Sequence, residues 1–169
     1  MYTPVLTEEE LAAIHQHAEA DYPAECCGVV LVRGVRGEGE PDRRLHACRN
    51  IQDVLHAKDP SRFPRDSRTA YYMASEDLLE IGRRETQGYG VHVIYHSHVD
   101  VGAYFSETDR RNALVEGEPT YPGAIYVVVG VRNGRADETR AFRWDGAARE
   151  FVEVPVALSA GATSGHETR

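Results

Sequence analysis

The chain has few of the features that mark secreted, membrane-spanning or nucleic-acid-binding proteins. It contains three cysteines, an odd number of which two are adjacent, so it indicates no disulfide framework and suits a reducing cytoplasm. The longest apolar run extends from Cys26 to Val32, far short of the ~20 residues that cross a bilayer, so we expect no membrane partner. The first residues, Met1 to Pro4, include no basic start and lead into no apolar core, and we therefore expect no export signal.

An excess of basic residues is also missing. Lys and Arg number 19 against 27 Asp and Glu, which gives a formal net charge of −8 at pH 7. Proteins that bind a nucleic-acid backbone carry a basic surface, so we expect no nucleic-acid partner. The composition is globular, with 41% hydrophobic and 27% charged residues, and it excludes wholesale disorder and fibrous architecture. At 169 residues the chain is also too short for the metal-dependent barrel hydrolases, which need roughly 250.

The pattern of apolar and turn residues predicts an α/β fold. The capping box Thr7-Glu8-Glu9-Glu10 and the helical spacing of the apolar residues after it predict a helix from about Glu8 to Ala20. The run from Cys26 to Val32 predicts a strand that is buried on both faces. Further strands are predicted at residues 45–51, 69–73, 91–98, 124–132, 141–144 and 150–156, further helices from Ser75 and Ser106, and a long polar loop at 52–68.

Helices alternate with strands in the first part of the chain, and hairpins dominate the last part. This order predicts a mixed β-sheet with helices packed against it. No repeat or linker interrupts the first 156 residues, so we expect a single domain over residues 1–156. Residues 157–169 are mostly Ser, Gly, Ala and Thr with scattered charges, and we expect a disordered C-terminal tail there.

The motif with the clearest chemistry is His96-Ser97-His98, within the strand predicted at residues 91–98. Side chains at i and i+2 of a strand point to the same face, so the two imidazoles project together while Ser97 points the other way. Converging imidazole nitrogens suit a divalent metal such as zinc. Asp109 lies one turn into the helix predicted from Ser106 and can supply an oxygen ligand. Two histidines and one carboxylate would leave a fourth position for water, as in catalytic zinc sites.

Each part of this pattern also has a simpler explanation. Histidines on strands often bind no metal, and Ser106 with Asp109 is equally a helix cap that places an acidic residue in the first turn. His92 lies about 13 Å along the strand from His96, too far to share one ion, so we interpret it as a core residue or one that supports the ligands. The adjacent pair Cys26-Cys27 is interpreted as two small apolar side chains that point to opposite faces. The other histidines, which stand in no metal spacing and are expected at the surface, are His15, His17, His46, His56 and His166.

Order and spacing together are more specific than any single part. The pattern His-x-His, seven residues, Ser, two residues, Asp resembles the motif of the JAMM metallopeptidases, the metal-dependent branch of the Mov34/MPN/PAD-1 family. That family places a glutamate upstream, beside a Cys-Gly pair at the start of a buried strand, and Tyr22-Pro23-Ala24-Glu25-Cys26-Cys27-Gly28 matches this context. The resemblance covers nearly the whole chain and points to the small prokaryotic members. It implies the cytidine-deaminase-like layered fold, with a curved mixed β-sheet flanked by helices.

The resemblance also implies a role for each matched residue. His96, His98 and Asp109 would bind one zinc ion per chain, which lowers the pKa of a water in the fourth position towards ~7. Glu25 would take the proton of that water and pass it to the leaving amine, and Ser106 would donate a hydrogen bond to the developing oxyanion. The implied reaction is hydrolysis of an amide or isopeptide bond. Substrates of the family are the C-terminal tails of ubiquitin-like proteins, including bacterial sulfur-carrier proteins that end in Gly-Gly.

Several alternatives stay open at this point. Some relatives keep the fold without the metal and act as binding scaffolds, although the intact motif disfavours this, and a hydrolase of a non-protein amide would use the same residues. Zinc deaminases are disfavoured because their His-x-Glu and Pro-Cys-x-x-Cys motifs are missing, and cupin-type oxygenases because helices are predicted. The polar loop carries Arg62, Arg65 and Arg68, which would meet an acidic partner, bind the carboxylate of the tail, or lie in solvent. The sequence does not indicate an oligomeric state.

Overall fold

The computed structural model of the chain describes residues 4–34, 39–160 and 165–167. Seven of its strands form one main sheet, and four short strands form two small two-stranded sheets, β1 with β10 and β5 with β6. The elements follow in the order β1 (Leu6–Thr7), α1 (Glu8–Asp21), β2 (Cys27–Arg33), β3 (Asp42–Cys48), α2 (Gln52–Lys58), α3 (Ser75–Thr86), β4 (Gly90–Val99), α4 (Glu107–Ala113), β5 (Leu114–Val115), β6 (Glu118–Pro119), β7 (Ile125–Arg132), β8 (Arg135–Asp145), β9 (Glu150–Val154), β10 (Leu158–Ser159) and β11 (Gly165–Glu167).

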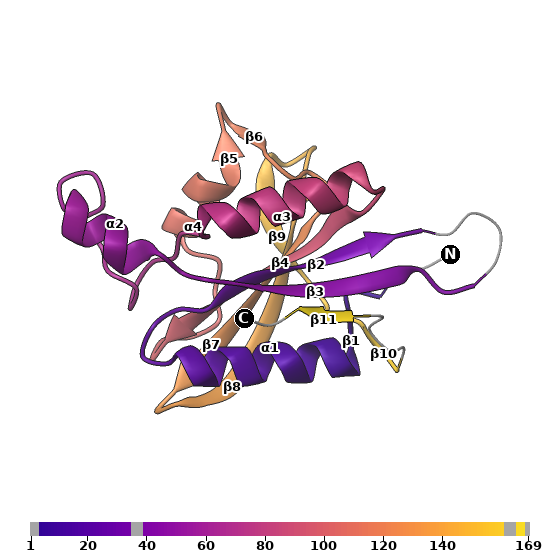
Figure 1. Ribbon diagram of the computed structural model, residues 1–169, viewed down its shortest axis with the longest axis horizontal. Helices are drawn as coiled ribbons and strands as arrows, with labels where there is room; N and C mark the ends of the chain where they lie inside the picture. Colours follow the sequence, from indigo (N-terminus) through magenta and orange to yellow (C-terminus); the bar gives the residue numbers. More distant parts are fainter. Residues whose placement is uncertain (1–3, 35–38, 161–164, 168–169) are drawn as a thin grey trace.

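The main sheet has the strand order β11-β3-β2-β4-β7-β8-β9 and is mixed (Figure 1). β4 lies at its centre, antiparallel to β2 and parallel to β7. β7, β8 and β9 form an antiparallel meander, and the turn from β7 to β8 uses Asn133 and Gly134, both with the positive φ that a type I′ hairpin needs. Because β4 and β7 are parallel, their carboxyl ends lie side by side at the same end of the sheet, where the chain leaves β4 for α4.

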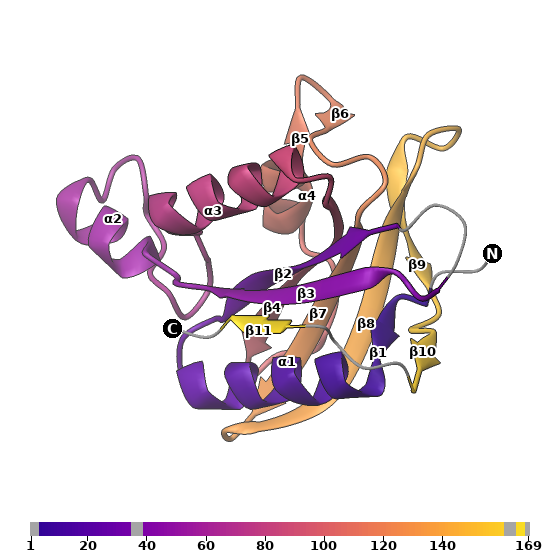
Figure 2. The ribbon, with the colours of Figure 1, turned by 45° about the vertical axis from the view of Figure 1, so that its right-hand side comes forward.

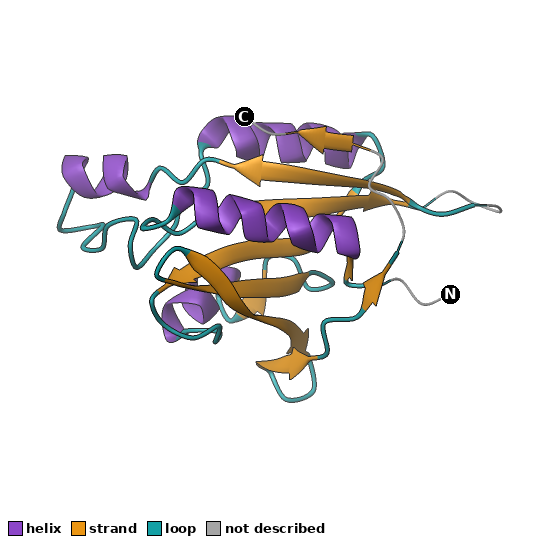
Figure 3. Ribbon diagram, turned by 90° about the horizontal axis from the view of Figure 1, so that it is seen from below, coloured by secondary structure: helices purple, strands orange, loops and turns teal. Residues whose placement is uncertain are grey.

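Helices cover both faces of this sheet (Figure 2). On one face, Ile14 of α1 packs into a core that includes Val93 and Tyr95 of β4. On the other face, Ile81 of α3 packs into a second core that includes Ile94. Because side chains alternate along a strand, the residues two and four positions after Ile94 face the α3 side of the sheet. α2 and the loop that follows it project from one end of the molecule (Figure 3).

This architecture confirms the predicted fold class, an α/β fold with a mixed sheet flanked by helices. The helix predicted from Glu8 is α1, and its capping box with Thr7 is present. The prediction of an irregular loop at residues 52–68 is wrong in its first part, where the chain forms α2. At seven residues, this helix is too short for an apolar periodicity to reveal it. The strand predicted at 69–73 is reduced to one bridge, between Asn50 and Met73.

The C-terminal segment, where we expected disorder from residue 157, contains two short strands. β10 pairs in parallel with β1, and β11 pairs in parallel with β3. Val5 N donates a hydrogen bond to Ala157 O at 2.9 Å, so the segment next to β1 holds this part of the chain. Residues 161–164 and 168–169 of the expected tail lie outside the described residues. Within the described ranges, none of the helices combines the length and apolar character needed to cross a membrane.

Candidate active site

The carboxyl end of β4 places two imidazoles together on the α3 side of the sheet. His96 and His98 follow Ile94 at steps of two, and their Nε2 atoms lie 3.3 Å apart. Both are buried, with 0% and 6% of their surface exposed. Ser97 points to the opposite face, where its Oγ accepts a hydrogen bond from Cys26 N at 2.8 Å. The alternation of the strand thus brings the two imidazoles together.

Asp109 approaches the two histidines from α4. Its Oδ1 lies 3.2 Å from His96 Nε2, and its Oδ2 lies 3.3 Å from His98 Nε2. The helix cap sets this position, because Ser106 N donates to Asp109 Oδ2 at 2.9 Å and Asp109 N donates to Ser106 Oγ at 3.0 Å. Burial raises the pKa of Asp109, but the charge of His96 and the hydrogen bonds from both imidazoles and Ser106 N outweigh burial and hold the pKa well below its usual range. Asp109 therefore faces the imidazoles as a carboxylate.

These three side chains fit a zinc ion in geometry and in donor chemistry. His98 Nδ1 lies 3.0 Å from Gly102 O, and since a carbonyl only accepts, Nδ1 carries the ring hydrogen. In the neutral ring, Nε2 is then a bare acceptor that faces the Asp109 carboxylate, an arrangement that requires a positive charge between them, either a proton or a metal ion. Zinc bonds of about 2.0–2.1 Å in a tetrahedron separate the ligand atoms by about 3.3 Å. The Nε2 atoms of the histidines lie 3.3 Å apart, and each lies 3.2–3.3 Å from an Asp109 oxygen, Oδ1 for His96 and Oδ2 for His98, which is close to this value.

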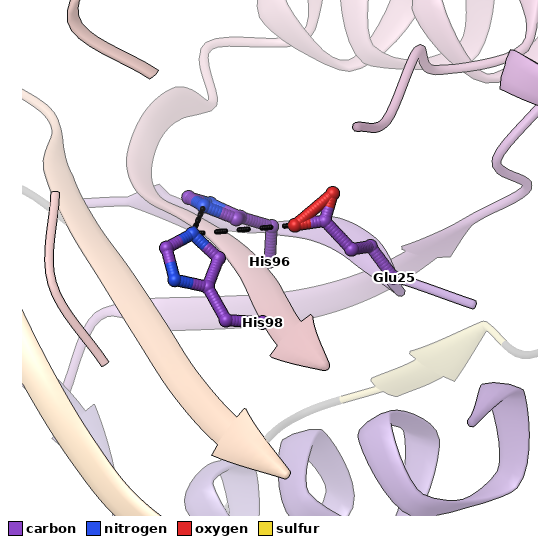
Figure 4. Close-up of side chains that lie close together, drawn as sticks. All are labelled: Glu25, His96 and His98. Carbon is purple, nitrogen blue, oxygen red and sulfur yellow. Dashed lines mark hydrogen bonds and ion pairs between the residues drawn. The ribbon is translucent and has the colours of Figure 1, made fainter. Parts of the chain in front are cut away.

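Glu25 reaches the same point from the segment that leads into the neighbouring strand, two residues before β2 begins (Figure 4). The pairing of Cys27 with His96 brings it beside β4. Its Oε1 lies 4.0 Å from His98 Nε2, farther than the Asp109 oxygens lie from the imidazoles, and within the described chain its Oε2 has no hydrogen-bond partner. Glu25, His96 and His98 also have ligand atoms close enough to hold an ion. The shorter distances favour Asp109 as the third ligand and leave Glu25 beside the metal position.

The surroundings of Glu25 favour its protonated form when no cation is present. The side chain is 4% exposed, and burial raises the pKa of Glu25 to about 9; the charge of Asp109 adds to this rise and the charge of Arg65 opposes it. A divalent cation nearby would stabilise the carboxylate and lower this pKa. A carboxyl group whose pKa stands above its ordinary value accepts a proton more readily than a solvent-exposed carboxylate does, as a general base must.

Ser106 is half-buried at the N-cap of α4. Its Oγ accepts the hydrogen bond from Asp109 N, and the hydroxyl donates to no acceptor in the described part of the chain. The hydroxyl hydrogen is therefore available to a group bound at the site. Capping uses a lone pair of the oxygen and oxyanion binding would use the hydrogen, so one residue can do both.

Two tyrosines that no motif marks hold the imidazoles in place. Tyr71 stacks on His96, with ring centroids 4.8 Å apart and an angle of 28° between the planes. Tyr104 meets His98 edge-on at 4.9 Å. Tyr71 also lines a groove of about 720 Å³, whose walls come from the loop after α2 and from α4. Both tyrosines lie in irregular segments, so neither apolar periodicity nor a motif could have singled them out.

The other candidate residues serve the fold. His92 Nε2 lies 2.9 Å from Pro4 O, so this histidine holds the N-terminal segment. All three cysteines are buried. His46 is also buried, contrary to its expected place at the surface, because its Nε2 lies 2.9 Å from Asp77 Oδ1 on α3. His46, Cys48 and Asp77 form a second group of possible ligand atoms. The side chain of His166 lies outside the described residues.

Known proteins place this chain in a family. The family model described as prokaryotic homologs of the JAB domain matches residues 7–145. The CysO-cysteine peptidases of Mycobacterium bovis and Mycobacterium tuberculosis are 32% identical over 152 residues, which cover 89% of this chain and 89% of each relative.

Solved structures share the fold. A protein from Desulfitobacterium hafniense superposes with a TM-score of 0.63 at 18% identity over 92% of each chain. A protein from Salinibacter ruber superposes with a TM-score of 0.58 at 26% identity, over 96% of this chain and 95% of the other. These matches confirm the resemblance inferred from the motif, and the chain belongs to the family of prokaryotic homologues of the JAB domain.

Proposed function

We propose that this protein is a zinc-dependent peptidase that hydrolyses an amide or isopeptide bond at the C-terminal tail of a ubiquitin-like or sulfur-carrier protein. The proposal depends on the convergence of His96, His98 and Asp109, whose ligand atoms lie 3.2–3.3 Å apart with Glu25 4.0 Å away. The name of the related proteins, CysO-cysteine peptidase, supports a peptidase that acts on a sulfur-carrier protein.

His96, His98 and Asp109 would hold the zinc ion, one per chain. When bound, zinc makes a water nucleophilic at neutral pH and polarises the substrate carbonyl as a Lewis acid. Hydrogen bonds orient two of the three ligands from behind: Gly102 O fixes the ring of His98, and Ser106 N fixes the carboxylate of Asp109.

Glu25 would take the proton from the attacking water and return it to the leaving nitrogen. Its burial keeps bulk water from competing for that proton, and its Oε2 has no partner among the described residues that would hold it away from the reaction. Ser106 would donate its hydroxyl hydrogen to the carbonyl oxygen of the substrate as negative charge develops there. In the bond that breaks, Glu25 thus acts on the leaving nitrogen, and Ser106 acts on the oxygen of the carbonyl group.

Cleavage of an extended carrier tail tests the proposal. The substrate is a sulfur-carrier protein whose C-terminal Gly-Gly is extended by one further residue. After incubation with the protein, the masses of the products are measured by mass spectrometry. We expect loss of the extra residue, inhibition by a chelator and recovery on addition of zinc. A protein that never binds zinc under these conditions refutes the zinc-dependent mechanism, and a zinc-loaded protein that leaves extended tails intact refutes the substrate class.

A further inference from the structure

A groove lies beside the proposed catalytic residues. It is lined by Tyr71, which stacks on His96, and by Thr108, which precedes Asp109 in the chain. Aromatic side chains make up much of its wall, namely Phe63, Tyr71, Tyr72, Tyr121 and Tyr126. A group bound in this groove would therefore lie next to the histidines.

Three arginines also line this groove: Arg62 and Arg65 from the loop after α2, and Arg111 from α4. The guanidinium of Arg62 lies over the ring of Phe63, 5.3 Å from its centroid. For Arg65 and Arg111, the described part of the chain supplies no carboxylate at ion-pair distance. Three positive charges in one groove, two of them without an ion pair to a carboxylate in the described part of the chain, suit an anionic ligand.

Hydrogen bonds fasten the loop that carries Arg65 to the backbone of Glu25. Gln52 Nε2 donates to Arg65 O at 2.9 Å. Two residues further on, Ser67 O accepts a hydrogen bond from Glu25 N at 2.7 Å. Asn50 Nδ2 in turn donates to Glu25 O at 2.9 Å. The backbone at Arg65 is thus held in a defined position relative to Glu25, as a binding residue requires.

We propose that Arg65 binds the free α-carboxylate of the leaving amino acid, and that this contact makes the protein prefer carrier tails whose last residue has a free carboxylate over tails whose leaving group lacks one. This inference rests on the proposed function. Glu25 must reach the leaving nitrogen, and in an α-amino acid the carboxylate sits on the carbon next to that nitrogen. Arg65 stands two residues before Ser67, whose carbonyl accepts the hydrogen bond from Glu25 N, and Arg65 lines the same groove as Tyr71, so it lies near the same place. In the lysine side chain released from an isopeptide bond, the carbon next to the leaving nitrogen carries no carboxylate for Arg65 to bind.

The reaction itself is an ordinary hydrolysis. The bond between the carbonyl carbon of the last carrier glycine and the nitrogen of the added amino acid breaks. The water oxygen joins the carbonyl carbon, and the water proton travels through Glu25 to the nitrogen. Arg65 takes no part in bond making, so its contribution is to bind and orient the leaving amino acid.

Two matched variants and two matched substrates test the inference. Arg65→Gln removes the charge but keeps a long polar side chain. Arg68→Gln removes the same charge from a residue of the same loop that is exposed, as Arg65 is, but does not line the groove. Each variant and the wild type receive a carrier tail ending in Gly-Gly-Ala, once as the free acid and once as the C-terminal carboxamide. We compare kcat/KM for the two forms at equal zinc content.

The wild type and Arg68→Gln should prefer the free acid by about tenfold, the usual order for a charge-assisted pair. Arg65→Gln should cleave both forms at similar rates, and Arg65→Lys should keep part of the preference. Equal cleavage of acid and amide by the wild type, or an unchanged preference in Arg65→Gln, overturns the inference and leaves the peptidase proposal standing. Cleavage of neither form by zinc-loaded wild type removes the proposed function and this inference with it.

Discussion

Glu25→Gln should abolish activity while leaving the metal site intact. The amide matches the carboxyl group in size but cannot take a proton from water. General acid–base catalysis contributes typically ~10²- to 10⁴-fold, so kcat should fall at least about 100-fold. Zinc binding should persist, because Glu25 Oε1 is 4.0 Å from His98 Nε2, whereas the two oxygens of Asp109 lie 3.2 and 3.3 Å from the ring nitrogens.

The same change should stabilise the zinc-free protein. Folding raises the pKa of Glu25 from 4.5 to about 9, through burial and the charge of Asp109. Between these values the unfolded chain loses this proton and the folded protein keeps it, so the free energy of unfolding falls as pH rises through that window. Each pKa unit is worth about 1.4 kcal/mol, so at pH 7 the raised pKa of Glu25 lowers the free energy of unfolding by about 3 kcal/mol. Glutamine does not titrate, so the variant is free of this loss. The melting temperature should therefore rise by several degrees.

Three measurements on the same samples decide the outcome: zinc content, cleavage of an extended carrier tail, and thermal melting in chelator at pH 5 and pH 8. We expect Glu25→Gln to hold one zinc, to cleave nothing, and to exceed the wild type in melting temperature at pH 8 more than at pH 5. His98→Ala is the control that loses zinc and activity together. Cleavage at the wild-type rate would show that Glu25 is not the base, and loss of zinc would show that Glu25 is itself a ligand.

Three further predictions concern the cap, the cysteines and the core. Ser106→Ala removes the N-cap acceptor and the free hydroxyl, so the free energy of unfolding should fall by about 1 kcal/mol and kcat by about 100-fold. Ser106→Thr keeps the hydroxyl and should preserve both stability and kcat. Thermal melting and steady-state kinetics measure the two effects, and an unchanged kcat in Ser106→Ala would exclude the oxyanion role. Burial raises the pKa of Cys26 to about 12 and that of Cys27 well above its usual value, so a thiol reagent at pH 8 should label the cysteines only after denaturation, and rapid labelling of the native protein would contradict the buried positions. Gly28→Ala would bring a Cβ within 2.3 Å of the Tyr95 ring and should lower the free energy of unfolding by about 1–3 kcal/mol. Gly82→Ala is the control, because the space around Gly82 is open and the substitution should not lower this free energy. Equal melting temperatures of the two variants would refute the close approach of Gly28 to Tyr95.

The sequence predicts well what depends on neighbours along the chain. The capping box locates α1, and the alternation of a strand places His96 and His98 on one face. Glu25 could not be chosen by such reasoning among 27 acidic residues, because its position depends on the pairing of β2 with β4. The hydrogen bond from Cys26 N to Ser97 Oγ, which joins residues 71 positions apart in the sequence, is one of the long-range contacts that hold Glu25 beside β4. The groove depends on distant segments in the same way: the sequence marks Arg62 and Arg65 in a polar loop, but only the folded chain places them in one groove with Arg111 of α4.

Ser106 and Asp109 show why a helix cap and a metal site cannot be told apart from sequence. In the structure, Asp109 Oδ2 caps α4 by accepting from Ser106 N, while both of its oxygens face the imidazoles. One carboxylate therefore fulfils both explanations, and neither excludes the other. The cap also holds Asp109 in place when no ion is bound. A metal ion would thus find its oxygen ligand already positioned by the fold, with little ordering left to occur on binding.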